Sequence, residues 1–242
     1  MTKVAVVTGG TRGIGSAISK ALHEAGHKVV ANFAGNVEKA EEFKSETGIE
    51  VMQWDVSQMA ACQEGLAKVE KDIGPVDILV NNAGITRDAM LHKMNEAQWQ
   101  EVINTNLNAL FYMCKCVIEG MRSRGFGRIV SISSINGQKG QLGQANYSAA
   151  KAGLIGFSKA VALENARKGI TVNVVSPGYI DTEMVAAVPE KVLQSIIETI
   201  PVGRLGKAEE IASMVAWLSS DMAAFTTGAV ITMNGGQYLA NG

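Results

Sequence analysis

The stretch KVAVVTGGTRGIGSAISKALHEAGHKVVANF, residues 3–33, most constrains how this chain can fold. Its first apolar run, VAVV, is typical of a buried parallel strand, and AISKALHEAG has helical spacing that ends at Gly26. A second apolar run follows, so the stretch predicts a strand, a glycine turn, a helix and a parallel strand. The turn holds Gly9, Gly13 and Gly15, and free N–H groups at a helix N-terminus after such a turn bind anions. A diphosphate would fit there.

The rest of the chain repeats the alternation of helix and strand. Helices are expected at 37–48, 58–74, 96–122, 147–166, 189–200 and 208–220, and strands at 49–56, 76–84, 128–134, 169–180 and 228–236. Right-handed crossovers then give one parallel sheet covered on both faces. The sequence has no linker, repeat or low-complexity run, so we expect a single α/β domain over residues 1–242, a Rossmann-like doubly wound parallel sheet.

Charge and composition favour small-molecule partners. The chain has 242 residues with 22 Lys and Arg against 23 Asp and Glu, so no overall field would draw it to nucleic acid or to an anionic membrane. No uncharged apolar run reaches the ~18 residues of a membrane span, and no basic-then-apolar leader opens the sequence, so we expect a cytoplasmic protein.

The thiols and imidazoles suggest no metal site. Cys62, Cys114 and Cys116 form no CxxC motif and are interpreted as free thiols in a reducing compartment. The histidines have no metal-ligand spacing and no evident catalytic partner; they are His23, His27 and His92.

Tyr147 and Lys151 form the main candidate for chemistry. Four residues apart on an expected helix, they project from one face about a turn apart. An ammonium beside a phenol favours the phenolate, so we expect Lys151 to lower the pKa of Tyr147. Ser134 follows the expected strand RIVSIS and adds a hydroxyl at the edge where open α/β sheets bind ligands. Taken alone, a Tyr-x-x-x-Lys pair is usually structural.

Other polar residues at the same edge admit two interpretations. Asn81 to Gly84 follow the fourth expected strand and are either a turn or part of the binding edge. Asn106 lies inside an apolar helical stripe, and because a buried amide without a partner is costly, it must bond to water, to a neighbouring polar group or to a functional partner.

The segment after the second strand bears on cofactor choice. Binders of NAD place an acidic residue there for the ribose 2′-hydroxyl, whereas an arginine suits a 2′-phosphate. This chain has Asn32 and no acid, and it carries Arg12 in the glycine turn. The pattern favours NADP, although Arg12 is also compatible with a solvated loop charge.

Taken together, TGGTRGIG, NNAG, Asn106, Ser134, Tyr147 and Lys151 resemble the short-chain dehydrogenase/reductase family along the whole chain. The resemblance implies Tyr147 as general acid toward a ketone oxygen and Ser134 as hydrogen-bond donor to it. Lys151 would also hold the nicotinamide ribose, and Asn106 would hold a water in a proton relay.

The same resemblance implies a set of cofactor contacts and an NADPH/NADP cofactor. The set comprises Gly9, Arg12, Gly13, Ile14 and Gly15 at the phosphates, Asp55 and Val56 at the adenine, Asn82, Ala83 and Gly84 at the ribose, and Tyr147, Lys151, Pro177, Gly178, Ile180 and Thr182 at the nicotinamide.

Within the family, GITRDAMLHKM, SINGQKGQLGQANYSAAKAG, PGYIDTEMV and NGGQY resemble acetoacetyl-CoA reductases of polyhydroxybutyrate synthesis. That likeness implies an acyl-CoA substrate reduced with NADPH, and the wider family resemblance implies a homotetramer. The helical excursion between core elements around residues 183–205 is a candidate substrate lid. The substrate contacts would be Asp88, Lys93, Ser134, Gln141, Gln144, Tyr147 and Tyr179. Leu142 departs from the aromatic residue that many CoA reductases carry there.

Two alternatives stay open. The motifs ITRD, GQANY and AAKAG are shared with the 3-oxoacyl-[acyl-carrier-protein] reductases of fatty acid synthesis. A non-catalytic dinucleotide-binding subunit is the more distant alternative, because a fold alone does not define chemistry.

Overall fold

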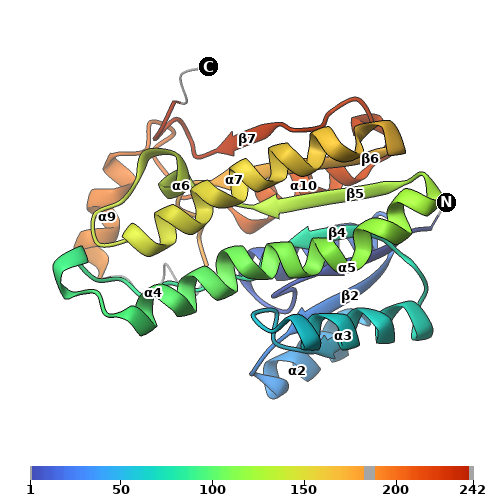
Figure 1. Ribbon diagram of the computed structural model, residues 1–242. Helices are drawn as coiled ribbons and strands as arrows, with labels where there is room; N and C mark the ends of the chain where they lie inside the picture. Colours follow the sequence, from blue (N-terminus) through green and yellow to red (C-terminus); the bar gives the residue numbers. More distant parts are fainter. Residues whose placement is uncertain (1, 183–188, 240–242) are drawn as a thin grey trace.

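A computed structural model describes residues 2–182 and 189–239 of the chain. Seven parallel strands form one sheet in the order β3-β2-β1-β4-β5-β6-β7 (Figure 1). Their bounds are Val4–Val7 (β1), Lys28–Phe33 (β2), Glu50–Gln53 (β3), Val76–Asn81 (β4), Gly127–Ile132 (β5), Ile170–Pro177 (β6) and Val230–Met233 (β7). The strand order reverses direction between β1 and β4, which confirms the expected doubly wound fold.

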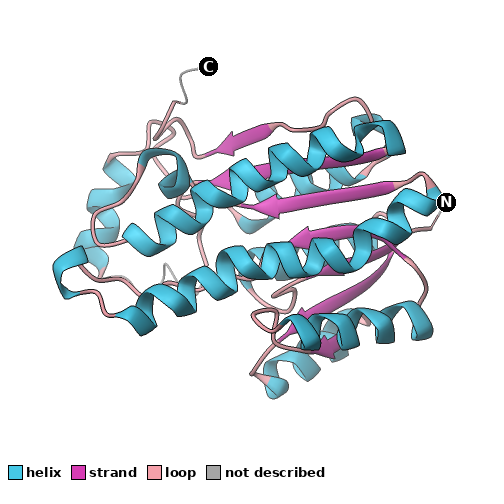
Figure 2. Cartoon of the chain, viewed as in Figure 1, coloured by secondary structure: helices cyan, strands magenta, loops and turns pink. Residues whose placement is uncertain are grey.

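Helices cover both faces of this sheet (Figure 2). The longer ones are α1 (Gly13–Glu24), α2 (Val37–Thr47), α3 (Met59–Asp72), α4 (Glu96–Ile103), α5 (Ala109–Arg124), α7 (Ala145–Asn165), α9 (Glu190–Glu198) and α10 (Ala208–Ser219). One buried cluster packs α3, α5 and α7 against the sheet, and a second packs α1, α2 and α10 against the opposite face. Because both faces are covered, β1 and β5 are buried along their whole length, as their continuous apolar runs predict.

Residues 96–122 are helical throughout, as expected, but the helix changes from α to π and back to α. Between α4 and α5, residues Asn104–Asn108 form a π-helical segment, η2. A π turn adds a residue to the helix and shifts which side chains face the core, and such turns are frequent at functional sites. Two members of the apolar stripe, Trp99 and Phe111, are exposed, so part of that stripe is surface and not core.

Two further segments frame the carboxyl edge of the sheet. A short helix that the sequence pattern did not predict, α6 (Ile135–Lys139), follows β5 directly. The expected helix at 189–200 is present as α9, and none of its residues is buried. Residues 183–188 of the expected lid lie outside the described residues.

Candidate active site

The turn between β1 and α1 can receive an anion only because its glycines lack side chains. Gly9 and Gly13 have positive φ values of 61° and 52°. A Cβ on Gly15 would lie 2.1 Å from the Gly9 carbonyl oxygen and 2.5 Å from Nδ2 of Asn82. No side chain caps helix α1 and no acidic residue lies in its first turn, so its N-terminal N–H groups face the turn uncompensated. A diphosphate fits this cradle.

The sequence NNAG braces the glycine turn from the neighbouring strand. The Asn82 side chain donates to the carbonyls of Thr8 (2.9 Å) and Gly9 (3.2 Å). The buried Thr8 hydroxyl accepts from the backbone N–H groups of both Asn82 and Ala83, each at 3.0 Å. Asn82 and Ala83 thus hold the glycine turn in place. Gly84 lies deeper, because a Cβ there would approach Oδ1 of Asn106 and Nζ of Lys151 at 3.3 and 3.5 Å.

The residues expected around the adenine lie just beyond β3. Asp55 is exposed and accepts a hydrogen bond from the Ser57 N–H at 2.9 Å, while Val56 is buried. The Asn32 side chain is buried and donates to the Trp54 carbonyl at 3.0 Å, so it joins β2 to the segment after β3. Arg12 is exposed and has no ion pair with any residue described, so its guanidinium is available to a ligand.

The segment after β6 closes the site on the other side. The Gly178 N–H donates to the Met233 carbonyl at 2.9 Å, which ties the segment to β7. Pro177 ends β6, and Ile180 is buried. Thr182 lies against the glycine turn, since a Cβ on Gly13 would meet its methyl group at 3.8 Å. Residues expected at the phosphates and at the nicotinamide are therefore neighbours.

Ser134 lies two residues beyond β5, at the carboxyl edge of the sheet, as expected. It is the N-cap of α6, and its Oγ accepts from the Asn136 N–H at 3.1 Å. Because the cap uses an oxygen lone pair, the hydroxyl hydrogen stays free for another acceptor.

Lys151 is buried and tied to the end of β5. Its Nζ donates to the Ile132 carbonyl at 2.7 Å, and its own carbonyl accepts from the Ser133 hydroxyl at 2.9 Å. The side chain is 4 % exposed and has no carboxylate partner among the described residues. Burial therefore lowers the pKa of Lys151 from 10.5 to about 8.

Tyr147 and Lys151 share one face of α7, as expected, with Nζ 5.6 Å from the centre of the phenol ring. The expectation that Lys151 lowers the pKa of Tyr147 is wrong for this structure. Burial raises the pKa of Tyr147, and the Asp88 carboxylate raises it further, while a hydrogen bond with Ser134 opposes the shift. At neutral pH Tyr147 therefore keeps its proton.

Asn106 has found a partner in the backbone. It lies in the π-helical segment, accepts from the Ile85 N–H at 2.8 Å and donates to the Ile85 carbonyl at 2.9 Å. A void of about 10 Å³ lies beside it, lined in part by Thr8, Asn81 and Lys151. This volume is at the lower limit for one water molecule, and the polar lining suits one. The expected water relay remains a prediction.

Only some of the residues expected at the substrate come together. Gln144 donates to the Asp88 carboxylate at 2.8 Å and accepts from the Asn136 side chain at 3.0 Å. The charge of Asp88 raises the pKa values of Tyr147 and Tyr179, after burial of each phenol, which places Asp88 close to both. Lys93 is exposed in a short 3-10 helix, η1 (Leu91–Lys93), without an ion pair among the described residues.

Among the described residues, the one hydrogen bond of Gln141 is made by its backbone. Its carbonyl accepts from the Gln144 N–H at 3.1 Å, in the loop between α6 and α7. Its place on this loop is compatible with the expected substrate contact.

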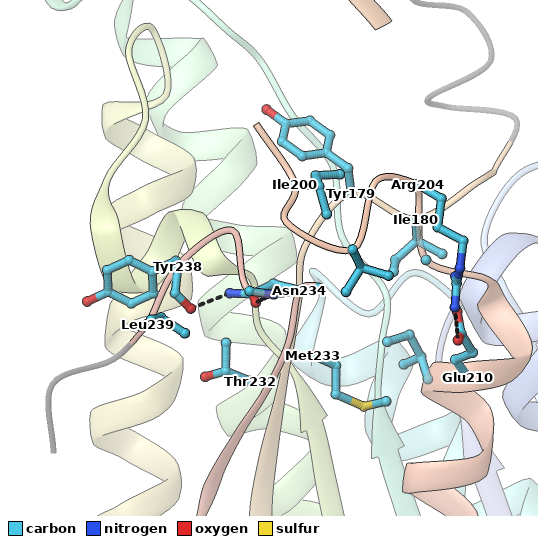
Figure 3. A pocket seen from close by; sticks show the side chains of 15 residues that line it. Tyr179, Ile180, Ile200, Arg204, Glu210, Thr232, Met233, Asn234, Tyr238 and Leu239 are labelled. Carbon is cyan, nitrogen blue, oxygen red and sulfur yellow. Dashed lines mark hydrogen bonds and ion pairs between the residues drawn. The ribbon is translucent and has the colours of Figure 1, made fainter. Parts of the chain in front are cut away.

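A cavity of about 550 Å³ opens beyond the carboxyl end of β7 (Figure 3). Tyr179 and Ile180 line it, together with Ile200 near the end of α9 and Asn234 after β7. Arg204 is held away from the cavity centre by Glu210, with two contacts of 2.9 and 2.7 Å. Neither Ser134 nor Tyr147 lines this cavity, so it does not contain the residues expected to carry the chemistry.

Comparison with known proteins agrees with this geometry. Residues 9–237 match a family model described as Enoyl-(Acyl carrier protein) reductase. The chain is 65 % identical to an acetoacetyl-CoA reductase of Shinella zoogloeoides, over 98 % of this chain and 99 % of the relative. It is 50 % identical to an acetoacetyl-CoA reductase of Cupriavidus necator over 98 % of both chains. A 3-oxoacyl-[acyl-carrier-protein] reductase FabG of Escherichia coli is 46 % identical, again over 98 % of both.

A doubly wound parallel sheet with a phosphate cradle, beside a Ser, Tyr and Lys cluster, is the architecture of a nucleotide-dependent oxidoreductase. The matches cover nearly the whole chain at high identity. The chain belongs to the short-chain dehydrogenase/reductase family.

Three buried or half-buried residues of this site were not singled out from the sequence. They are Thr8, Asn136 and Asn146, and each makes contacts to a segment far away in the chain or in another element. Local pattern gives no sign of such contacts. The one available signal was the adjacency of Asn146 to Tyr147.

Among the residues described, no helix has the length and apolarity that crossing a membrane requires. Within the same residues, no group of three or more His, Cys, Asp or Glu side chains is placed to hold a metal ion.

Proposed function

We propose that this protein reduces acetoacetyl-CoA to (R)-3-hydroxybutyryl-CoA with NADPH. The observation that carries the proposal is the convergence of Ser134, Tyr147 and Lys151 beside the glycine turn at the carboxyl edge of the sheet. The nicotinamide, when bound, supplies a hydride to carbon 3 of the substrate, and the protein supplies a proton to the oxygen on that carbon. The C=O bond thereby becomes CH–OH.

The protonation states suit this direction of reaction. Tyr147 has a raised pKa, so it holds a proton to give to the oxygen as negative charge develops there. The hydrogen of the Ser134 hydroxyl, which the helix cap leaves unused, would donate a second hydrogen bond to the same oxygen when substrate is bound. The ammonium of Lys151 would stabilise the phenolate that Tyr147 becomes when it gives up its proton, and Lys151 would also bind the nicotinamide ribose. Asn106 would hold a water next to Lys151.

The residues around the phosphates and adenine would bind the rest of the cofactor. Gly9, Gly13, Ile14 and Gly15 present the N-terminus of α1 to the diphosphate. Preference for NADPH is supported by the unpaired Arg12 and by the segment Ala34–Gly35–Asn36, which offers no carboxylate at the end of β2.

Selection of the thioester is assigned to polar contacts. A short acyl chain offers little apolar area, so Asp88, Gln141, Gln144 and Tyr179 would orient the substrate through hydrogen bonds. Lys93 would contact the phosphates of CoA. Four relatives that are 50 to 65 % identical are named acetoacetyl-CoA reductase, which supports CoA as the carrier.

We also propose a cytoplasmic homotetramer in polyhydroxybutyrate synthesis. The three cysteines are free thiols, as suits a reducing compartment. Several large apolar side chains are exposed on the surface of the single chain. They are Phe111 on α5, Leu163 on α7, and Met222 and Phe225 in the segment after α10. Exposed apolar patches of this kind mark association surfaces. Helix α9 would serve as a substrate lid.

The proposal is tested by initial rates of NADPH oxidation with acetoacetyl-CoA and, in parallel, with acetoacetyl-[acyl-carrier protein]. We expect kcat/KM to favour the CoA thioester and NADPH over NADH. Tyr147→Phe is the control for the proton donor: it should lose about 100-fold or more in kcat, while NADPH still binds.

A preference for the carrier protein would move the enzyme to fatty acid synthesis, as the FabG relatives at 46 % identity allow, and leave the catalytic roles intact. Near-normal turnover by Tyr147→Phe would refute the proton donor. Absence of turnover by the unaltered protein with both thioesters would refute the proposed reaction.

A further inference from the structure

Asn146, the residue before the proton donor, joins three segments of the chain. It is 0 % exposed. Its Oδ1 accepts from the Tyr147 N–H at 2.8 Å, and its Nδ2 donates to the carbonyls of Arg87 and Gln98, each at 3.0 Å. One side-chain amide thus uses its acceptor and both of its donors on three different backbone positions.

The acceptor half of this amide completes the N-terminus of α7. Helix α7 begins at Ala145, and the preceding Gln144 provides no side-chain cap. The first N–H groups of a helix have no partner within it, and a buried one is costly. Asn146 supplies the missing acceptor for Tyr147, so the backbone of the proton donor depends on this amide.

The donor half holds the segment that carries Asp88. We define the substrate strap as residues 85–93, which lead away from the NNAG sequence. Asn106 binds the strap at Ile85, and the Gly143 carbonyl accepts from the strap at Ala89 (2.9 Å). Asn146 binds it between these points, at the carbonyl next to Asp88.

Removing the amide would therefore break the link between the strap at Arg87 and the first turn of α7, and would leave the Ala89–Gly143 backbone bond as the remaining backbone tie between them. Gln144 still reaches Asp88 through an exposed hydrogen bond, but such a bond between two flexible side chains fixes the strap weakly. The Asn146 contacts join backbone carbonyls to a buried amide, so they define position more strictly.

We propose that Asn146 is a positioning residue that holds Tyr147 and the substrate strap in register, so that the proton donor and the contacts of Asp88 meet the same substrate. The inference rests on the proposed thioester reduction. It adds a residue that touches neither substrate nor cofactor, and acts through Tyr147 and through the strap.

The test compares Asn146→Asp with Asn173→Asp. Asn173 is also 0 % exposed, and its amide also bonds backbone, donating to Thr226 at 2.8 Å and accepting from Ala229 at 3.2 Å, but it lies in β6 away from the strap. Each change keeps the side-chain shape and replaces a donor that faces a carbonyl with an oxygen. Both should lose stability.

Per folded molecule, Asn146→Asp should lose at least about 10-fold in kcat/KM for the thioester, with the Kd of NADPH changed less than about twofold. Asn173→Asp should keep its kcat/KM within about twofold of the unaltered protein. Equal kcat/KM losses in the two variants would overturn the proposal. Should Asn146→Asp not fold, Asn146→Ser replaces it, with Asn173→Ser as its control.

A double-mutant cycle separates positioning from general destabilisation. If Asn146 acts by placing the strap, Asp88→Asn should cost at least about threefold less kcat/KM in the Asn146→Ser background than in the unaltered protein. Costs that simply multiply would contradict the proposal.

If neither thioester is turned over, the proposed reaction fails, but the positioning role is still testable. Amide hydrogen exchange provides that test because it does not depend on turnover. Asn146→Ser should speed exchange at least about 10-fold in peptides covering the strap and the start of α7, compared with Asn173→Ser. Unchanged protection in those peptides would refute the positioning role.

Discussion

Burial shifts the pKa values of the two residues at the centre of the proposed chemistry. Lys151 loses affinity for its proton because the side chain is desolvated, and Tyr147 gains affinity for the same reason. Both shifts follow from place in the fold, and the raised pKa of Tyr147 opposes what the spacing of the pair alone suggests. In the free protein at pH 7, both residues are protonated, which is the state that a reductase needs.

The first residue-scale prediction concerns Lys151→Met. Burying the ammonium opposes folding by about 3 kcal/mol for a pKa lowered from 10.5 to about 8. Loss of its hydrogen bond leaves the Ile132 carbonyl unpaired at a cost of about 1–3 kcal/mol, so the two effects nearly cancel. We expect kcat to fall about 100-fold or more while the free energy of unfolding in urea, at pH 7, stays equal or rises.

The pH dependence gives this prediction its sign. Below pH 8 both folded and unfolded Lys151 are charged, so the full burial cost is present; between pH 8 and 10.5 the folded protein releases the proton first and the cost declines. The unaltered protein should therefore gain stability relative to Lys151→Met as the pH rises through this window, and kcat/KM should decrease above about pH 8. A stability difference that does not change from pH 7 to 10 would contradict the lowered pKa.

At the scale of elements, the site is made by the ends of β1, β4, β5 and β6, which all point the same way. Parallel strands bring their carboxyl ends to one edge, so the glycine turn, the NNAG sequence, Ser134 and the Pro177–Gly178 segment meet there. Helix α7 then lays Tyr147 and Lys151 across that edge. The close approach of backbone at the turn is what suits this edge to the proposed cofactor.

Gly15→Ala tests the element-scale account. Its Cβ would overlap the Gly9 carbonyl oxygen, so the turn must open and the N–H groups of α1 must move away from the diphosphate. We expect NADPH affinity, measured by fluorescence titration, to fall at least about 10-fold, with a loss of stability of about 1–3 kcal/mol.

The control for this change is His23→Ala, an exposed position on the same helix. Alanine is a good helix former, so stability and NADPH affinity should both stay close to those of the unaltered protein. Equal NADPH affinities in Gly15→Ala and His23→Ala would show that the turn does not cradle the phosphates.

At the scale of the whole molecule, the residues that the structure describes leave the β7 edge of the sheet and the outer faces of α5 and α7 exposed. Edge strand β7 is half-buried, and fully exposed Phe225 lies in the segment between α10 and this strand. Leu163 and Phe111 are exposed on α7 and α5, which lie side by side over one face of the sheet (Figure 1). Such faces favour association with further copies of the chain.

Phe225→Asp should break the contact proposed at the β7 edge. A charge in the centre of an apolar contact costs several kcal/mol, whereas the folded monomer would tolerate it because the side chain is exposed. Sedimentation velocity should show a tetramer for the unaltered protein and a smaller species for the variant, with unchanged far-ultraviolet circular dichroism. Equal sedimentation of variant and unaltered protein would exclude this position from the interface, and Lys168→Asp serves as the charge-changing control at another exposed site.

Much of this protein follows from local sequence. The alternation of apolar runs and helical stripes is a periodic signal, and the parallel sheet follows from it because strand–helix–strand units cross over with one hand. Gly15 and Ser134 could be identified because their chemistry depends on a backbone turn and on the end of a strand, which are both encoded nearby. The spacing of Tyr147 and Lys151 likewise determined that they share a helix face.

The tertiary structure alone decided what depends on burial and on contacts between distant segments. The pKa of Tyr147 reversed its expected direction because desolvation acts on both members of the pair, and desolvation is a property of the packed core. Asn106 and Asn146 lie 40 residues apart, yet their amides hold one strap, and neither partner is near in sequence. Hydrogen bonds between remote segments form only where folding has brought the groups within about 3 Å of each other, so no local pattern contains them.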